Sequence, residues 1–314
     1  MNVYRSLNDM SYPSPVTVSI GTFDGVHLGH RAIVQKLLDC ASRHDGEALV
    51  VTFDPHPREI VGRGPVQYLT TIEERLKLLS ELGVRETLVL PFTHELSRLS
   101  PGEFYEDHLI RVLDVAEVVV GYDHMFGRDR VGGFNELQSI GARLGFRATA
   151  VSPVTVEQEI VSSSRIRQLL SEGKGESASK LLGRTYSLEA TVVHGDGRGA
   201  SLGFPTANLQ PCAVQKIVPA SGVYFVRLTI AMQEYFGMLN IGSRPTFHAD
   251  GQSVIEVHLF DFQNDLYDRT VEIHFLKSLR AERKFSSVDE LIAQLQHDRL
   301  TCQKFINEIH HITQ

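Results

Sequence analysis

The sequence predicts an α/β domain followed by a small β-barrel, and three observations lead to this prediction. The chain has 314 residues, a length at which two domains can each bury a core. Up to about residue 154 apolar runs of strand length alternate with helical patterns, which is typical of a parallel sheet with right-handed crossovers. Between about residues 188 and 275 short β-rich runs are separated by Gly, Pro, Asn and Asp, which is the composition of an antiparallel barrel.

Each element of the first domain has its own pattern. Strands are expected at residues 16–20, 47–54, 86–92, 116–121 and 147–154, and helices at residues 31–43, 72–82, 101–112 and 134–145. In the first of these helices Ile33, Val34, Leu37 and Leu38 recur at helical spacing, so one face of the helix turns toward a core. We therefore predict a Rossmann-like domain, in which helices flank a parallel sheet.

The second half of the chain follows a different pattern. Two short helices are expected at residues 164–170 and 176–182, followed by a linker at residues 182–188. The β-rich runs lie at residues 188–195, 222–230, 234–242, 254–262 and 270–275, and a terminal helix is expected at residues 287–311. We predict a small antiparallel barrel with a C-terminal helix, and domains at residues 1–183 and 184–314.

The composition limits the function classes. A net charge of −7 and a pI of about 6.1 disfavour a general nucleic-acid binder, which normally has a basic surface. The sequence contains no apolar run of about 18 residues, and its first residues lack the pattern of a secretory signal. Cys40, Cys212 and Cys302 are scattered and form no C-x-x-C motif, so a disulfide framework or a zinc knuckle is not expected. The predicted location is the cytoplasm.

A phosphate site is predicted where the first strand meets the first helix, in the stretch GTFDGVHLGH (residues 21–30). Gly21 and Gly25 relax the backbone there, and the positive end of the helix favours an anion. His27 and His30 project to one face, Gly29 leaves room for a ligand, and two imidazoles can donate hydrogen bonds to phosphate oxygens. Taken alone, the pair could also be two surface histidines. No G-x-x-x-x-G-K-[ST] motif occurs, so the site is not a P-loop.

This stretch resembles the H-x-G-H motif of the nucleotidylyltransferase superfamily, in the form typical of prokaryotic FAD synthetases. TFDPHP (residues 52–57), VVGYDHMFGRDRVGGFNEL (residues 119–137, with His124 and Met125 as departures) and VSSSRIR (residues 161–167) resemble three further blocks of that family. SSSRIR alone could be a helix N-cap. The resemblance implies catalytic roles for His27, His30 and Arg167, and flavin contacts for His56, Pro57, Phe126 and Gly127. It implies nucleotide contacts for Gly21, Thr22, Phe23, Asp24, Gly25, Gly29, Gly121, Asp123, Ser162 and Ser164.

In the second half, LGFPTANL (residues 202–209) resembles the P-T-A-N motif of riboflavin kinases, the module that is fused to FAD synthetase in bacteria. NIGSRPTF (residues 240–247), EVHLFDF (residues 256–262) and RAERKF (residues 280–285) resemble the rest of the family pattern, with Ala200 as a departure. The resemblance implies Thr206 and Asn208 as ligands of Mg²⁺ and Glu256 as catalytic base. It further implies nucleotide contacts for Gly195, Gly197, Gly203 and Pro205, and flavin contacts for Arg280 and Phe285.

The chemistry of these residue types is compatible with phosphoryl transfer. A hydroxyl and an amide carbonyl supply the oxygen ligands that a hard cation prefers, and a carboxylate can accept the proton of an attacking hydroxyl. Each residue also has a plainer interpretation. Glu256 could be an outward-facing strand residue, and Thr206 and Asn208 could form a turn.

Together the motifs predict a bifunctional riboflavin kinase/FMN adenylyltransferase. Its kinase module would phosphorylate riboflavin with ATP, giving FMN and ADP, and its first module would adenylylate FMN with a second ATP, giving FAD and pyrophosphate. Both steps would use Mg²⁺. We expect a monomer or weak self-association, and neither nucleic acid nor a membrane as partner. The alternatives are a monofunctional FMN adenylyltransferase with an inactive or flavin-sensing barrel, a flavin carrier without chemistry and, more remotely, a nucleic-acid-binding regulator.

Overall fold

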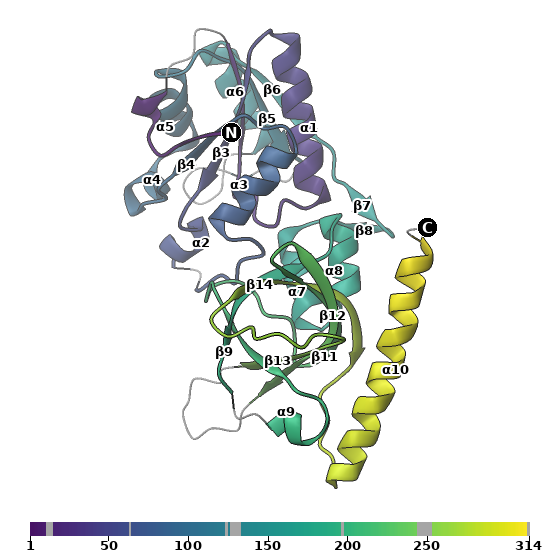
Figure 1. Ribbon diagram of the computed structural model, residues 1–314. Coiled ribbons are helices and arrows are strands. Elements are labelled where there is room, and N and C mark those ends of the chain that lie inside the picture. The colour runs from purple at the N-terminus through teal and green to yellow at the C-terminus, as the bar shows by residue number, and fades with distance from the viewer. Residues whose placement is uncertain are drawn as a thin grey trace. The chain divides into compact units, whose positions relative to one another are not determined.

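The computed structural model describes residues 1–10, 15–62, 64–122, 125, 133–195, 198–243 and 253–312. The chain divides into two compact units, residues 1–163 and 164–314, whose elements are labelled in Figure 1. Within the described ranges none of the helices has both the length and the apolar character that a membrane crossing requires.

A six-stranded parallel sheet forms the centre of the first unit, with the strand order β1-β4-β3-β2-β5-β6. Its strands are β1 (Asn2–Tyr4), β2 (Val16–Ile20), β3 (Glu47–Phe53), β4 (Glu86–Leu90), β5 (Val115–Gly121) and β6 (Arg147–Val151). All five residues of β2 are buried, as expected for a central parallel strand that is covered on both faces. The predicted parallel sheet is therefore confirmed.

Helices cover both faces of this sheet, and successive residues of β3 show it. Ala48 and Val50 pack with α1 (Leu28–Arg43) and α3 (Ile72–Glu81). Leu49 and Val51 pack with α5 (Pro101–Tyr105), the π-helical turn η2 (Glu106–Ile110) and α6 (Phe134–Leu144). The smaller elements of the unit are η1 (Leu7–Asp9), α2 (Pro57–Ile60), α4 (His94–Arg98), β7 (Thr155–Val156) and β8 (Glu159–Ile160).

A closed antiparallel barrel forms the second unit, with the strand order β10-β13-β12-β11-β14-β9. Its strands are β9 (Ser187–Val193), β10 (Ala207–Pro211), β11 (Gly222–Ile230), β12 (Gln233–Ser243), β13 (Ser253–Leu259) and β14 (Thr270–Arg280). Alternate residues fill the interior, among them the buried Leu188, Ala190, Val226, Leu239, Ile255, Val257 and Ile273. The short helix α9 (Arg198–Ser201) lies between β9 and β10.

The terminal helix α10 (Val288–Ile312) packs on the outside of the barrel, as Figure 1 shows. Phe225 and Met238 point out from the barrel wall and pack in one cluster with Cys302 and Phe305 of the helix. An α/β unit, a closed barrel and a C-terminal helix are thus present, and the predicted fold class is confirmed.

Two helices before the barrel pack against it. α7 (Ser163–Ser171) and α8 (Gly175–Leu182) precede β9, and α8 contacts β14. The Ala220 amide donates to the Leu170 carbonyl at 3.0 Å, and the Tyr186 amide donates to the Ser179 hydroxyl at 3.2 Å. By contact these helices therefore belong to the second unit, whereas the sequence assigns them to the first domain. The functional boundary at residues 183 and 184 stays a prediction.

Candidate active sites

The loop between β2 and α1 has an unusual backbone. Phe23, Gly25 and Val26 have φ angles of 46°, 86° and 38°. These values lie in the left-handed region, which residues other than glycine rarely adopt. Phe23 and Val26 are buried, so packing holds the loop in this conformation. Such concentrated strain is a feature of functional loops.

Asp24 fixes the same loop from within. Its fully buried carboxylate accepts hydrogen bonds from the Leu69 and Thr70 amides at 3.0 Å and from the Thr70 hydroxyl at 3.1 Å. The Gly25 amide in turn donates to the Thr70 hydroxyl at 2.9 Å. The carboxylate thus ties the loop to the segment before α3, and a direct nucleotide contact of Asp24 stays a prediction.

The two predicted histidines lie together at the start of α1. His27 is the N-cap residue, and its Nδ1 accepts a hydrogen bond from the His30 amide at 3.3 Å. The two imidazoles stack with their centroids 3.6 Å apart and their planes 16° from parallel. Because Nδ1 is the acceptor, the proton of a neutral His27 ring is on Nε2. The pair therefore presents an N–H donor at the positive end of a helix, which suits an anion.

Glycines of this motif make room for neighbouring aromatic rings. A side chain at Gly29 would come within 3.2 Å of the His27 ring and within 3.6 Å of the Val161 carbonyl, and one at Gly21 would meet the Phe23 ring at 3.3 Å. The His27 imidazole thus takes up the space next to the Gly29 backbone, and a ligand close to Gly29 stays a prediction. Thr22 lies beside these residues, and its carbonyl accepts the Thr52 hydroxyl at 3.0 Å.

His56 and Pro57 form a second turn after β3. His56 is the N-cap of α2 and accepts from the Arg58 amide at 3.1 Å, and Pro57 is the first helical residue. The buried His56 ring lies 6.1 Å from the Tyr68 ring, nearly parallel to it. Both residues therefore have a clear structural function, and their predicted flavin contact is untested.

The serine-rich segment separates into residues with different environments. Ser163 donates its hydroxyl hydrogen to the Asp24 carbonyl at 2.9 Å and so joins the strained loop. Ser162 precedes α7 and is half-buried, Ser164 is exposed, and Arg167 is half-buried on α7 in the second unit. Gly121 ends β5. The predicted contacts at Asp123, Phe126, Gly127 and Gly197 lie outside the described residues.

A carboxylate between two amides stands on the barrel wall. Glu256 of β13 is paired with Asn208 of β10 on one side and with Asn240 of β12 on the other. Side chains of directly paired residues share one face with their Cβ atoms about 5 Å apart. Thr206 comes two residues before Asn208 and completes the group.

The polar side chains of this group are only partly buried. Glu256, Thr206, Asn208 and Asn240 are half-buried, and none makes a side-chain hydrogen bond to another described residue. The barrel interior takes the alternate residues, so Glu256 does face outward, as its plainer interpretation holds. It differs from an ordinary solvated residue by its two amide neighbours.

The turn that carries Thr206 is tightly packed. A side chain at Gly195 would overlap the Asn208 amide, and one at Gly199 would overlap the Phe204 carbonyl and reach the Thr206 hydroxyl at 3.0 Å. Gly203 has a φ of 80° and directs the chain into the turn. These glycines let the backbone approach the two predicted metal ligands.

His258 anchors this turn to the barrel. Its Nδ1 lies 2.8 Å from the exposed Pro205 carbonyl oxygen. Burial lowers the pKa of His258, the Pro205 hydrogen bond raises it and the charge of Arg299 lowers it again, with a net value below the usual one. Its surroundings therefore favour the neutral form of the ring.

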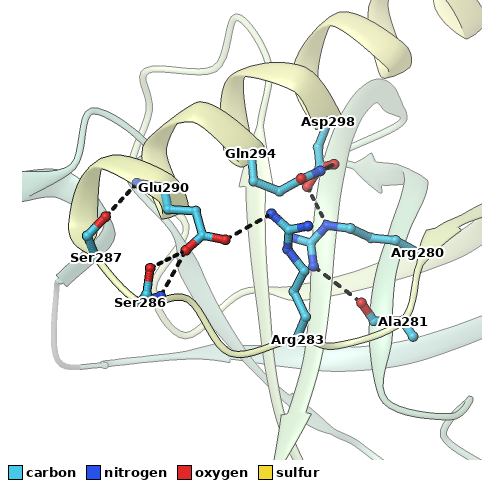
Figure 2. A network of polar contacts seen from close by, with 8 residues as sticks. All are labelled: Arg280, Ala281, Arg283, Ser286, Ser287, Glu290, Gln294 and Asp298. Carbon is cyan, nitrogen blue, oxygen red and sulfur yellow. Dashed lines mark hydrogen bonds and ion pairs between the residues drawn. The ribbon is translucent and has the colours of Figure 1, made fainter.

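Arg280 belongs to a polar network between β14 and α10, shown in Figure 2, and the Phe285 ring lies beside its guanidinium. Arg280 donates from Nε to the buried Asp298 carboxylate at 2.9 Å, and Asp298 also accepts from Gln294 at 2.6 Å. The Phe285 ring lies 5.6 Å from the Arg280 guanidinium and 4.6 Å from that of Arg283. Arg280 thus holds the helix on the barrel, and the flavin contacts of Arg280 and Phe285 stay predictions.

Sequence reasoning missed Ser163, Asn240 and His258. Each lies inside a motif that the sequence singles out. Their contacts depend on strand register and on backbone partners far away in the chain, which only the structure shows. No cluster of three or more His, Cys, Asp or Glu side chains suited to a metal occurs in the described part of the chain. A metal here would instead need hydroxyl and amide ligands together with substrate phosphates.

Fold and site define a two-module enzyme of nucleotidyl and phosphoryl transfer. The FAD synthetase family model matches residues 9–165, and the riboflavin kinase family model matches residues 182–306. The chain is 36% identical to the bifunctional riboflavin kinase/FMN adenylyltransferase of Listeria monocytogenes over 294 residues, which cover 93% of each chain. It is 36% identical to the protein of that name from Escherichia coli over 310 residues, which cover 97% of this chain and 98% of the relative.

The chain belongs to the bifunctional riboflavin kinase/FMN adenylyltransferase family. Both modules are present, which confirms the predicted bifunctional enzyme rather than its monofunctional alternative. A solved structure titled as a macrolide-efflux protein from Streptococcus pneumoniae has the same fold, with a TM-score of 0.87 and 32% identity. The matched region covers 96% of this chain and 98% of the Streptococcus pneumoniae chain.

Proposed function

We propose that the two reactions are divided along the predicted domain boundary. Residues 1–183 transfer an adenylyl group from ATP to FMN, and residues 184–314 transfer a phosphoryl group from ATP to riboflavin. The matches of the FAD synthetase family to residues 9–165 and of the riboflavin kinase family to residues 182–306 support this division.

In the kinase reaction Glu256 accepts the proton of the riboflavin 5′-hydroxyl as that oxygen attacks the γ-phosphorus of ATP. The observation that carries this assignment is the cross-strand pairing of Glu256 with Asn208 and Asn240 beside the Thr206 turn. The neighbouring amides are uncharged, so they place no like charge beside the carboxylate. Thr206 and Asn208 fit Mg²⁺ because each offers an oxygen atom that accepts no hydrogen bond from another described side chain, and a hard cation prefers oxygen ligands. When bound, Mg²⁺ neutralises phosphate charge.

In the adenylyl transfer an oxygen of the FMN phosphate attacks the α-phosphorus of ATP, and pyrophosphate leaves. The attacking phosphate is already ionised, so this step needs no general base. Nε2–H of His27, together with His30, stabilises the charge that develops on the phosphates, and Arg167 keeps the phosphate role that the resemblance implies. The stacked histidine pair at the start of α1 supports this role.

Two substitutions in the full chain test the division of labour. Glu256→Gln removes the base, so FMN formation from riboflavin falls about 10²–10⁴-fold while FAD formation from supplied FMN is kept. His30→Ala does the opposite, and FAD formation falls about 10²–10³-fold while FMN accumulates. Chromatography of the products from riboflavin, ATP and Mg²⁺ measures both.

The wild-type protein is the reference in this experiment. If either folded variant lost both activities, the proposed division would be wrong. Wild-type protein that formed neither FMN nor FAD would support the flavin carrier instead. FMN without FAD would remove the adenylyl transfer from the proposal.

The setting of the enzyme is proposed from its cysteines and substrates. Cys40, Cys212 and Cys302 are free thiols, which is usual in a reducing compartment, and ATP is consumed in both reactions. We place the enzyme in the cytoplasm as a monomer or a weakly associating chain. Light scattering over a range of protein concentrations tests this association state.

A further inference from the structure

His258 links two parts of the kinase site that are distant in the sequence. It follows Glu256 by two positions on β13, so both side chains lie on the outer face of the barrel. Its Nδ1 lies 2.8 Å from the Pro205 carbonyl oxygen. A carbonyl oxygen only accepts, so Nδ1 carries the proton and donates.

The imidazole is held on two sides by aromatic rings. The Phe204 ring lies 5.3 Å away and the Phe260 ring 5.7 Å away, both edge-on. Phe204 is itself buried, and its amide donates to the Gly199 carbonyl at 2.9 Å. The donor nitrogen of His258 therefore has a fixed place between two packed side chains.

The Pro205 carbonyl is the point at which His258 meets the turn. Pro205 has no N–H, so its carbonyl is its one backbone hydrogen-bonding group. Thr206 follows directly and precedes β10. The His258 hydrogen bond thus fixes the backbone next to the Thr206 hydroxyl.

We propose that His258 is a positioning residue of the kinase reaction, which sets the Thr206 hydroxyl relative to the Glu256 carboxylate through its hydrogen bond to Pro205. The proposal rests on the proposed roles of Thr206 and Glu256. Displacement of a positioning contact by about 1 Å can cost about 10²-fold in rate. The effect of losing this hydrogen bond therefore falls mainly on turnover.

Two variants separate the N–H group from the ring. His258→Phe keeps an aromatic ring between Phe204 and Phe260 but has no donor. His258→Asn loses the ring and keeps an N–H donor near the position of Nδ1. We expect His258→Phe to lower kcat for FMN formation by about 10–100-fold, and His258→Asn to recover most of that loss.

A second measurement does not depend on turnover. Calorimetric titration with Mg²⁺–ADP reports on the Thr206 turn, and we expect His258→Phe to bind about fivefold more weakly, the size of one neutral hydrogen bond. FAD formation from supplied FMN is the internal control and stays at the wild-type rate in both variants.

Two results would overturn the proposal. They are wild-type kcat and Mg²⁺–ADP binding in His258→Phe, and equal losses of kcat in both variants. The first would show that the hydrogen bond is not needed, and the second that the ring matters rather than its N–H. If wild-type protein itself formed no FMN, the proposed function would fail instead.

Discussion

His27 uses its two ring nitrogens for different purposes. Nδ1 accepts the His30 amide and caps α1, which leaves the proton on Nε2. Gly29 leaves room for the ring, because a side chain at this position would come within 3.2 Å of it. His27 thus combines a structural hydrogen bond with its proposed role as a donor to phosphate, and substitution can separate the two.

Replacing His27 by Asn or Ala tests this double role. Asn is a favoured N-cap, so His27→Asn keeps stability and lowers FAD formation about 10²–10³-fold. His27→Ala loses the same activity and also about 1 kcal/mol of unfolding free energy. Thermal unfolding and FAD assays measure both effects. Equal unfolding temperatures of the two variants would show that His27 does not act as a cap.

At the scale of elements, α1 is fixed at both ends. Its first turn holds the histidine pair, and beyond its last turn His44 Nε2 lies 3.0 Å from the Glu117 carboxylate of β5. Thr149 donates to Glu117 at 2.5 Å, and the Arg43 guanidinium lies 3.9 Å away. The Glu117 side chain has no exposed surface, so the helix is tied to the sheet by a buried charge.

This tie predicts a pH-dependent stability. Burial raises the pKa of Glu117, but hydrogen bonds from Thr149, His44 and Cys40 lower it, and the net pKa lies below the usual value. Because the pKa of Glu117 is lower in the folded state, its ionised form contributes its full stabilisation above the unfolded pKa of about 4.3. That contribution is lost as the pH falls through the folded value.

The variant Glu117→Gln isolates the effect. Near pH 7 it is less stable than wild type by about 1–3 kcal/mol, because a buried amide replaces the carboxylate. The difference shrinks as the pH falls below about 4.3. Calorimetric unfolding at several pH values measures it. A stability difference that stayed constant over that range would contradict the assignment.

At the scale of the whole molecule, the contact boundary and the predicted domain boundary differ by the two helices α7 and α8. Leu170, Leu181 and Leu182 of these helices are buried, and α8 contacts β14 of the barrel. The barrel therefore depends on residues that precede it in the predicted domain division.

Two fragments test this dependence. We expect residues 164–314 to fold and melt cooperatively, and residues 184–314 to melt at a lower temperature or to aggregate. Each fully buried Leu contributes roughly 1.5–3 kcal/mol to the free energy of unfolding. The contribution of α7 and α8 is therefore a large fraction of the total stability of a domain. Circular dichroism against temperature compares the two. Equal melting temperatures would show that the barrel is stable without the helices.

The sequence by itself determined the fold class, the two modules and the positions of the chemical motifs. Apolar periodicity and short strings such as P-T-A-N are local, so they can be recognised without coordinates. The edge strand β1 was missed because three residues give no period, and the helix predicted at residues 101–112 is divided at Tyr105 into α5 and a π-helical turn.

Tertiary structure decided how the motif residues are used. Strand register placed Asn240 beside Glu256, and a backbone carbonyl 53 residues away gave His258 its partner. Arg280 contacts Asp298 across a helix–barrel interface that no local pattern indicates. The physical reason is that hydrogen bonds and register join segments far apart in the chain, whereas sequence patterns report only on near neighbours.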